Sequence, residues 1–168
     1  FPFPGSHLRQ LVEGLLAPPD TAMAPGPDPW RANQLVWPVL ELLPELVEQP
    51  EAQLLKRWLA EHSIGNRLEL AQWQLGRAIA DAFDDYALYR PDLLAAWWQG
   101  KPVDGRGEPL AAAQLWQPLL LAALRDRLGE QPFGLKVQAA IHQLRQGAPP
   151  AGTLPSHVRL FGLSSLAP

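Results

Sequence analysis

Apolar residues recur at every third or fourth position along most of this chain, which is the spacing of one face of an α-helix. The longest clean stretch covers residues 68–89, where apolar side chains keep this spacing without an intervening proline. Pro91 disfavours helical geometry in the residue before it, so we expect this helix to end near Tyr89. Glycines and prolines separate the other periodic segments. Together these segments predict about seven helices, in or around residues 6–17, 28–46, 50–59, 68–89, 91–98, 109–128 and 136–146.

Capping and breaking residues suggest where the helices begin and end. Ser6 can cap the first helix, and Asp28 followed by Pro29 has the pattern of an N-cap with proline at the first helical position. Pro38 and Pro44 lie inside the second periodic segment, so we expect a late start or a kink there. Further stops or interruptions are expected at Pro18, Gly100, Pro118, Gly129 and Gly147.

Residues 157–163 differ from the rest, because apolar and polar side chains alternate there as in a strand. A single strand cannot satisfy its own backbone groups, so we expect it to pair with a sheet outside this chain or to be frayed. Both chain ends suggest a piece of a longer polypeptide. The predicted fold class is mainly α with one C-terminal strand, in a single region. Its parts are an opening segment and helix at 1–17, a helical bundle at 28–147 and a strand at 157–164.

Composition narrows the range of functions. The 168 residues are 47% hydrophobic, which is enough for a folded core and excludes wholesale disorder. The net charge of −3 argues against a non-specific nucleic-acid binder, because that role needs a basic surface. The absence of cysteine excludes disulfides, thiol catalysis and cysteine-based zinc sites. The sequence has no run of 18 apolar residues, so no membrane span is expected, and it has no P-loop motif.

An acidic cluster near the end of the helix at 68–89 is the first candidate site. Asp81 lies one turn before Asp84 and Asp85, so three carboxylates share one patch, and Arg90 follows them. Like charges at this spacing repel each other and oppose the helix dipole. Three interpretations stay open: a solvated helix face with Arg90 neutralising one acid, acceptors for the amino groups of nucleobases, or a divalent-metal site. No nearby glutamate or histidine completes a metal shell.

Aromatic residues form a second candidate. Trp97 and Trp98, with Tyr86 and Tyr89, could stack the bases of a single strand or could pack helix against helix. The four histidines lack metal-binding spacing, which favours surface or capping roles for them.

Several motifs, taken in order along the chain, are together similar to one family. Phe1-Pro-Phe-Pro4 resembles an F-P-L-P segment, and residues 37–46 resemble W-x-L-x-x-L-L-P-x-L. Residues 80–92 are similar to A-D-L-F-D-Q-Y followed by Y-R-P-D, and residues 158–168 to V-F-x-x-G-I-S-A-L-P-P. The chain thus resembles the N-terminal region of the RecC family, the gamma subunits of exodeoxyribonuclease V (the RecBCD complex).

The resemblance implies a fold and a role. It implies a helical insertion subdomain of an inactive helicase-like fold, whose sheet the strand at 157–164 would re-enter. It also implies a non-catalytic segment that guides the 3′ single strand of DNA through a channel in which the Chi sequence is read. The implied partners are the RecB and RecD subunits and DNA, with no membrane contact, in the bacterial cytoplasm. No cofactor is implied for this chain, because ATP and Mg²⁺ are used by the partner subunits.

The resemblance also implies contact residues by position. The candidates for DNA or Chi contact are Asp81, Asp84, Asp85, Arg90, Phe3 and Arg9. Phe3 stands where the family has leucine, and Arg9 where it has tryptophan. The resemblance therefore supports strand passage more than recognition of the same Chi sequence.

The residues alone leave two other functions open. One is a free-standing helical module that binds a protein partner through Trp97, Trp98 and the leucine-rich helices. The other is a metal-dependent enzyme that uses Asp81, Asp84 and Asp85.

Overall fold

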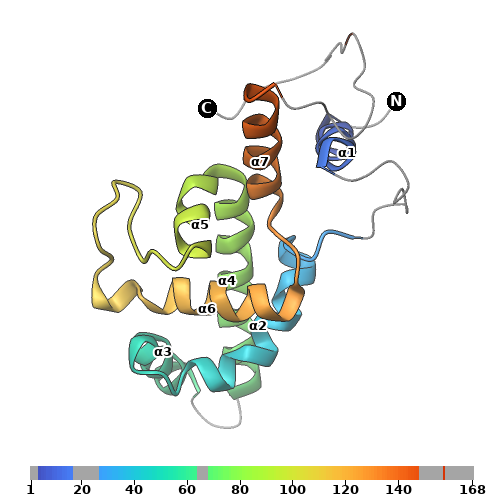
Figure 1. The fold of residues 1–168 in the computed structure, drawn as a ribbon. Helices are drawn as coiled ribbons and strands as arrows, with labels where there is room; N and C mark the ends of the chain where they lie inside the picture. Colours follow the sequence, from blue (N-terminus) through green and yellow to red (C-terminus); the bar gives the residue numbers. More distant parts are fainter. Residues whose placement is uncertain (1–3, 17–26, 64–67, 148–156, 158–168) are drawn as a thin grey trace.

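A computed structural model of the chain describes residues 4–16, 27–63, 68–147 and 157. The described residues are mainly helical, which confirms the mainly α part of the predicted class (Figure 1). The helices are α1 (Pro4–Leu16), α2 (Ala32–Leu46), α3 (Gln53–His62), α4 (Leu68–Tyr89), α5 (Pro91–Trp98), α6 (Trp116–Leu128) and α7 (Phe133–Arg145), with short 3₁₀ helices η2 (Pro50–Ala52) and η3 (Ala112–Gln114). Within the described residues, β pairing is limited to an isolated antiparallel bridge between Val103 and Pro109. The strand predicted at 157–163 lies outside the described residues, apart from His157, which is exposed.

Two helices begin at positions other than the predicted caps. α1 begins before Ser6, which lies in its first turn, so the prediction of a cap at Ser6 is wrong. α2 begins at Ala32 with Arg31 in the N-cap position, which confirms a late start but not a cap at Asp28. Asp28 instead forms a turn, in which its carboxylate accepts from the Trp30 N–H at 3.0 Å and its carbonyl accepts from the Arg31 N–H at 3.2 Å. This turn sets the direction in which the chain enters α2.

Three prolines lie within helices. α2 continues through Pro38 and Pro44 without a break, although each removes a backbone donor. Burial of one face supports this helix through Ala32, Leu35, Val36, Val39, Leu43 and Leu46. Pro118 lies in the first turn of α6, where an N–H would have no partner within the helix. The prediction of a helix from residue 109 is therefore wrong in its first part, because residues 112–114 form the 3₁₀ helix η3 and α6 begins only at Trp116. Pro118 lies in α6 and does not interrupt it.

Glycines end the later helices as predicted. Gly129 follows α6 and Gly147 follows α7, each with φ of +69°, and Gly100 follows α5 with φ of +75°. This left-handed backbone is open to glycine at little cost, which explains why the helical pattern stops there. α7 begins at Phe133, one turn before the predicted residue 136.

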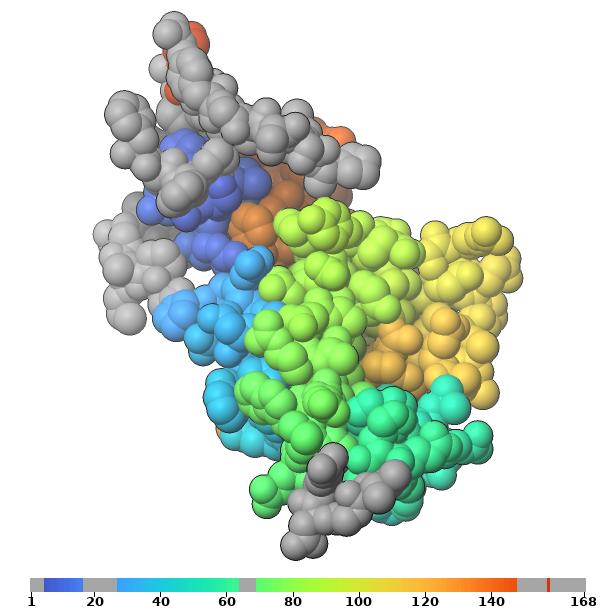
Figure 2. All heavy atoms as spheres, turned by 180° about the vertical axis from the view of Figure 1, so that it is seen from behind, coloured from blue at the N-terminus to red at the C-terminus, as the bar shows by residue number. Residues whose placement is uncertain are grey.

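α4 is the central helix of the main core. It packs on α2, α3, α5 and α7, and its pairing with α2 is the most extensive in the structure. Figure 2 shows α2 and α4 side by side on one face of the molecule. Trp30 is 1% exposed in this core, and its Nε1–H donates to the Glu130 carbonyl at 2.9 Å, so its polar atom is satisfied. The long helix at 68–89, the firmest feature of the sequence pattern, thus organises the fold.

A smaller core joins α1 to α7. Val12 and Leu15 of α1 pack with Ala140 of α7, and Phe133 and Val137 lie against them. α1 is therefore attached beside the main bundle, near the start of α2 (Figure 1).

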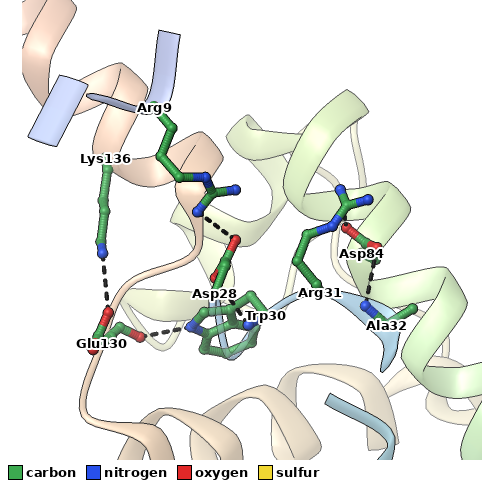
Figure 3. Close-up of polar contacts among 8 residues, drawn as sticks. All are labelled: Arg9, Asp28, Trp30, Arg31, Ala32, Asp84, Glu130 and Lys136. Atoms are coloured by element: carbon green, nitrogen blue, oxygen red, sulfur yellow. Dashed lines mark hydrogen bonds and ion pairs between the residues drawn. The ribbon is translucent and has the colours of Figure 1, made fainter. Parts of the chain in front are cut away.

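Asp84 of α4 caps α2 from outside that helix. Its Oδ2 accepts the backbone N–H of Ala32 at 3.0 Å, and its Oδ1 accepts from Arg31 Nη1 at 3.2 Å (Figure 3). Ala32 is the first residue of α2, so its N–H has no acceptor within the helix. The carboxylate also carries negative charge to the positive end of the helix dipole. One side chain thus links the start of α2 to the middle of the fold.

We expect Asp84→Ala to lower the free energy of unfolding by about 1–2 kcal/mol, the scale of a lost N-cap. Asp81→Ala on the same helix is the matched control, because among the described residues the polar partner of Asp81 is Arg77, in an exposed ion pair. That change should cost about 0.5 kcal/mol or less. Urea unfolding of the two variants measures the difference, and equal losses would show that Asp84 does not act as a cap.

Gly134 allows α7 to pass close to the junction of α4 and α5. A Cβ at this position would overlap the carbonyl oxygen of Ala87 and press on Pro91. We expect Gly134→Ala to destabilise the fold by about 1–3 kcal/mol, although alanine is the better helix former. Gly14→Ala in α1 is the control, because nothing lies within 4 Å of its added Cβ. Thermal unfolding should separate the pair, and a Gly134→Ala variant as stable as Gly14→Ala would disprove the close approach.

Candidate nucleic-acid interface

An open groove of about 910 Å³ runs between α1, the start of α2 and one face of α4. Its floor on α4 is the stripe of Arg77, Asp81, Asp84 and Leu88, spaced by three or four residues so that they share a helix face. Residues 27–34 form the opposite wall. The lining as a whole consists of Gly5, Ser6, Arg9, Gln10, Pro27, Asp28, Arg31, Ala32, Asn33, Gln34, Arg77, Asp81, Asp84, Leu88 and Phe133.

Three arginine–aspartate pairs line this groove. Arg9 Nη1 lies 2.7 Å from Asp28 Oδ2, and Arg31 Nη1 lies 3.2 Å from Asp84 Oδ1 (Figure 3). On α4, Arg77 contacts both carboxylate oxygens of Asp81, with Nη2–Oδ1 at 3.1 Å and Nε–Oδ2 at 3.2 Å. Among the described lining residues these six carry all the charge, so the side-chain charges of the groove cancel.

The acidic cluster predicted from the sequence is divided by this arrangement. Asp81 and Asp84 both line the groove, and each faces an arginine, which relieves the repulsion expected between them. Asp85 is exposed, does not line the groove, and makes no ion pair with any other described residue. Of the three neighbouring carboxylates, two are therefore paired with an arginine, and Asp85 alone stays without a described counter-charge.

Arg90 does not neutralise an aspartate, so that part of the sequence interpretation is wrong. Its guanidinium packs on Gly105, so closely that an added Cβ there would overlap it. The loop that carries Gly105 is ordered by Asp104, whose carboxylate accepts the backbone N–H groups of Arg106 at 2.8 Å and Glu108 at 3.0 Å. These two hydrogen bonds, the one from Arg106 first, lower the pKa of Asp104 below its usual value. Arg90 is thus held at the 101–108 loop and not in the groove.

The opening segment contains two candidates, Arg9 and Phe3, of which the structure describes only Arg9. Arg9 lines the groove, pairs with Asp28, and lies 4.6 Å from the centre of the Phe133 ring. Its side chain is 26% exposed and that of Asp28 is 11% exposed, so this pair is the most enclosed of the three. Arg9 therefore joins α1 to the turn before α2. Phe3 lies outside the described residues.

Several groove residues were missed by the sequence reasoning. Arg77 could have been found, because it precedes Asp81 by four residues on a helix, the spacing of an ion pair. Arg31 could not, because its partner Asp84 lies 53 residues away. The amides of Gln10, Asn33 and Gln34 also carry no signal in the sequence, since they become neighbours only when α1 and α2 meet α4.

The aromatic candidates of the sequence belong largely to the core. Trp97 is 3% exposed, and its Nε1–H donates to the Val103 carbonyl at 2.8 Å. Tyr86 meets Trp97 edge to face, with ring centres 5.9 Å apart. The packing interpretation is therefore confirmed for both. Trp98 packs against Trp30 at 6.0 Å, whereas Tyr89 is 56% exposed.

Groups of metal-ligating residues and membrane-spanning helices are both absent from the described part of the chain. No three of its histidine or acidic residues are grouped so that they could hold a metal ion. None of its helices is long and apolar enough to cross a bilayer.

Comparisons with known proteins identify the chain. The family model of the RecC N-terminal domain matches residues 1–168. The RecBCD enzyme subunit RecC of Escherichia coli is 33% identical over 173 residues, a match that covers 100% of this chain. RecC subunits of Mycolicibacterium smegmatis and Mycobacterium tuberculosis are 31% and 33% identical, each over 83% of the chain.

The relatives are much longer proteins. The match covers 14% of the Escherichia coli subunit and 12% of each mycobacterial one. No solved structure matches the chain significantly. The full-length family match and the identities above 30% show that this chain belongs to the RecC family and corresponds to the RecC N-terminal domain.

Proposed function

We propose that this chain is a non-catalytic segment of a RecC-type subunit that contacts the 3′ single strand of DNA and takes part in reading the Chi sequence. It would act within an exonuclease V complex with RecB and RecD subunits in the bacterial cytoplasm, where those partners use ATP and Mg²⁺. In this proposal the helices are an insertion in an inactive helicase-like fold. The names of the relatives, RecBCD enzyme subunit RecC, support the assembly.

The groove with its three arginine–aspartate pairs carries the proposal. Carboxylates accept hydrogen bonds from the amino groups of cytosine and adenine, arginine can donate two to guanine, and an amide can bond adenine at two atoms. The groove offers all three groups in Asp81, Arg77 and Gln34, for example. Its cancelling charges attract phosphates little, because phosphate binding depends on net positive charge. Such a lining suits base edges better than a nucleic-acid backbone.

The exposed pairs can open at low cost. The side chains of Arg77 and Asp81 are 45% and 51% exposed, and an ion pair this exposed contributes about 0–1 kcal/mol. A bidentate contact between a side chain and the correct base is worth about 1–3 kcal/mol of discrimination. Opening this pair therefore costs less than the discrimination that a base contact provides between the correct base and a wrong one. Breaking the more enclosed pair of Arg9 and Asp28 would cost more free energy, so we assign this pair to holding α1 in place.

The other predicted contact residues have different places in the proposal. Asp84 keeps one oxygen on the Ala32 N–H, so only its Oδ1, now on Arg31, is available to a base. Asp85 and Arg90 would meet only a strand that runs past the end of α4. Phe3 stays a prediction from the resemblance.

We expect Asp81→Asn, introduced in the full-length subunit of the assembled complex, to weaken the Chi response at least about fivefold and to leave unwinding unchanged. The substitution keeps the size of the side chain but turns an acceptor into a donor at one atom. Asp126→Asn is the control, because Asp126 is an exposed carboxylate paired with Arg125 on α6, away from the groove. The readouts are the cleavage pattern of a Chi-containing duplex and the unwinding rate.

A photo-crosslinking residue in place of Gln34 tests the strand path independently. Gln34 is exposed and lines the groove, so it should crosslink to the 3′ strand and not to the 5′ strand. An unaltered Chi response in Asp81→Asn together with no crosslink from position 34 would refute the proposal.

A further inference from the structure

Two tryptophans form an exposed pair on the α2–α4 face. Trp37 of α2 is 59% exposed and Trp73 of α4 is 41% exposed. Their ring centres are 5.7 Å apart, and the ring planes meet at 53°. By contrast, Trp30 and Trp97 are buried in the core. More than half of Trp37 is thus open to solvent, although it lies within a leucine-rich helix.

This tryptophan pair continues the lining of the groove. Trp37 follows Asn33 and Gln34 by four and three residues on α2, so it lies one turn further along the same helix face. Trp73 precedes Arg77 by four residues on α4, in the same relation. Since α2 and α4 pack side by side (Figure 2), the two residues extend the lining of the groove by one turn along this seam.

The surroundings of the pair favour a ligand with flat apolar faces and polar edges. Exposed polar side chains lie one turn or less from the rings on both helices, among them Gln34, Glu41, Gln74 and Arg77. Among the residues with described burial, Leu70, which is 50% exposed, is the one exposed large apolar side chain within a turn of either ring along its helix. A nucleobase meets this description, because it stacks through its faces and forms hydrogen bonds through its edges.

We propose that Trp37 and Trp73 form a stacking platform for a base of the 3′ single strand as it leaves the groove. The inference rests on the proposed function, since it extends the path of the same strand. It also supplies what the groove lacks: a groove whose charges cancel holds phosphates weakly, whereas stacking on aromatic rings binds any base without net charge. The groove then selects bases, and the tryptophan pair retains the strand.

The test uses the assembled complex with full-length subunits and a DNA end whose 3′ single-stranded tail carries 5-iododeoxyuridine at successive positions. Irradiation should crosslink one tail position to a peptide that contains Trp37 or Trp73. Trp37→Leu should reduce that yield at least about fivefold, the scale of one lost stacking contact, whereas Trp37→Phe should keep most of it. Trp58→Leu is the control, because Trp58 stacks on His62 of α3 outside the groove.

Hydroxyl-radical footprinting distinguishes DNA from other occupants. Trp37 and Trp73 should be oxidised in the complex without DNA and protected when the tail is bound. Protection without DNA would mean that another segment of the complex covers the pair, and it would overturn the platform. A crosslink from position 34 with none from the tryptophans would overturn the platform but leave the proposed function standing. Loss of the position 34 crosslink as well, together with an unaltered Chi response in Asp81→Asn, would refute both.

Discussion

The pairing of α2 with α4 is the constraint on which the rest of the structure depends. Both helices bury one apolar face in the main core, and Gly76 lets Leu40 of α2 lie where a larger residue on α4 would press against it. Asp84 fixes the register of the pair by capping the first turn of α2. The groove wall at 31–34, its floor on α4 and the exposed tryptophan pair all lie along this one seam. A shift of α2 along α4 would therefore disturb the core and the candidate site together.

The charges of the groove are consistent with the recognition of bases that we propose. Each of its three arginines faces an aspartate, so none offers a free positive charge to a phosphate. The exposed pair of Arg77 and Asp81 adds little stability, and it leaves a donor and an acceptor accessible to the proposed strand. In the full subunit, segments outside this chain would supply attraction for the backbone. The present helices would then discriminate between bases, through a groove that is neutral overall but offers carboxylate, guanidinium and amide groups.

The sequence predicted the helices better than it predicted the contacts between them. The bounds of α4 and the stops at Gly129 and Gly147 follow from apolar spacing and from backbone preferences, which are local properties. The caps at Ser6 and Asp28 were wrong for a physical reason. A capping residue shows that it can accept a hydrogen bond, but not which N–H will lie within reach. The acceptor for α2 comes from Asp84, 52 residues away from Ala32.

The candidate site could be predicted only in part, for the same reason. Asp81 and Asp84 were found because they share a helix face, and Arg77 was within reach of the same argument. For Trp97 and Trp98 the sequence left base stacking and helix packing open, and the buried stripe of α5 takes Trp97 into the core. The sequence pattern did not single out Trp37, yet it faces solvent beside Trp73. A tryptophan at the edge of the apolar face of a helix is buried or exposed according to how the neighbouring helix packs. The sequence pattern does not contain that information.

The salt dependence of strand binding tests most directly whether the groove recognises bases. The affinity of the assembled complex for a 3′ single-stranded tail is measured at several salt concentrations, for the unaltered subunit and for Arg77→Gln. If Arg77 contacts a base, the variant binds more weakly at every salt concentration, but the slope of log affinity against log salt stays the same. If Arg77 contacts a phosphate instead, the slope becomes shallower by about 0.7, the value for one lost phosphate contact on a single strand, and the account of a base-reading groove is contradicted.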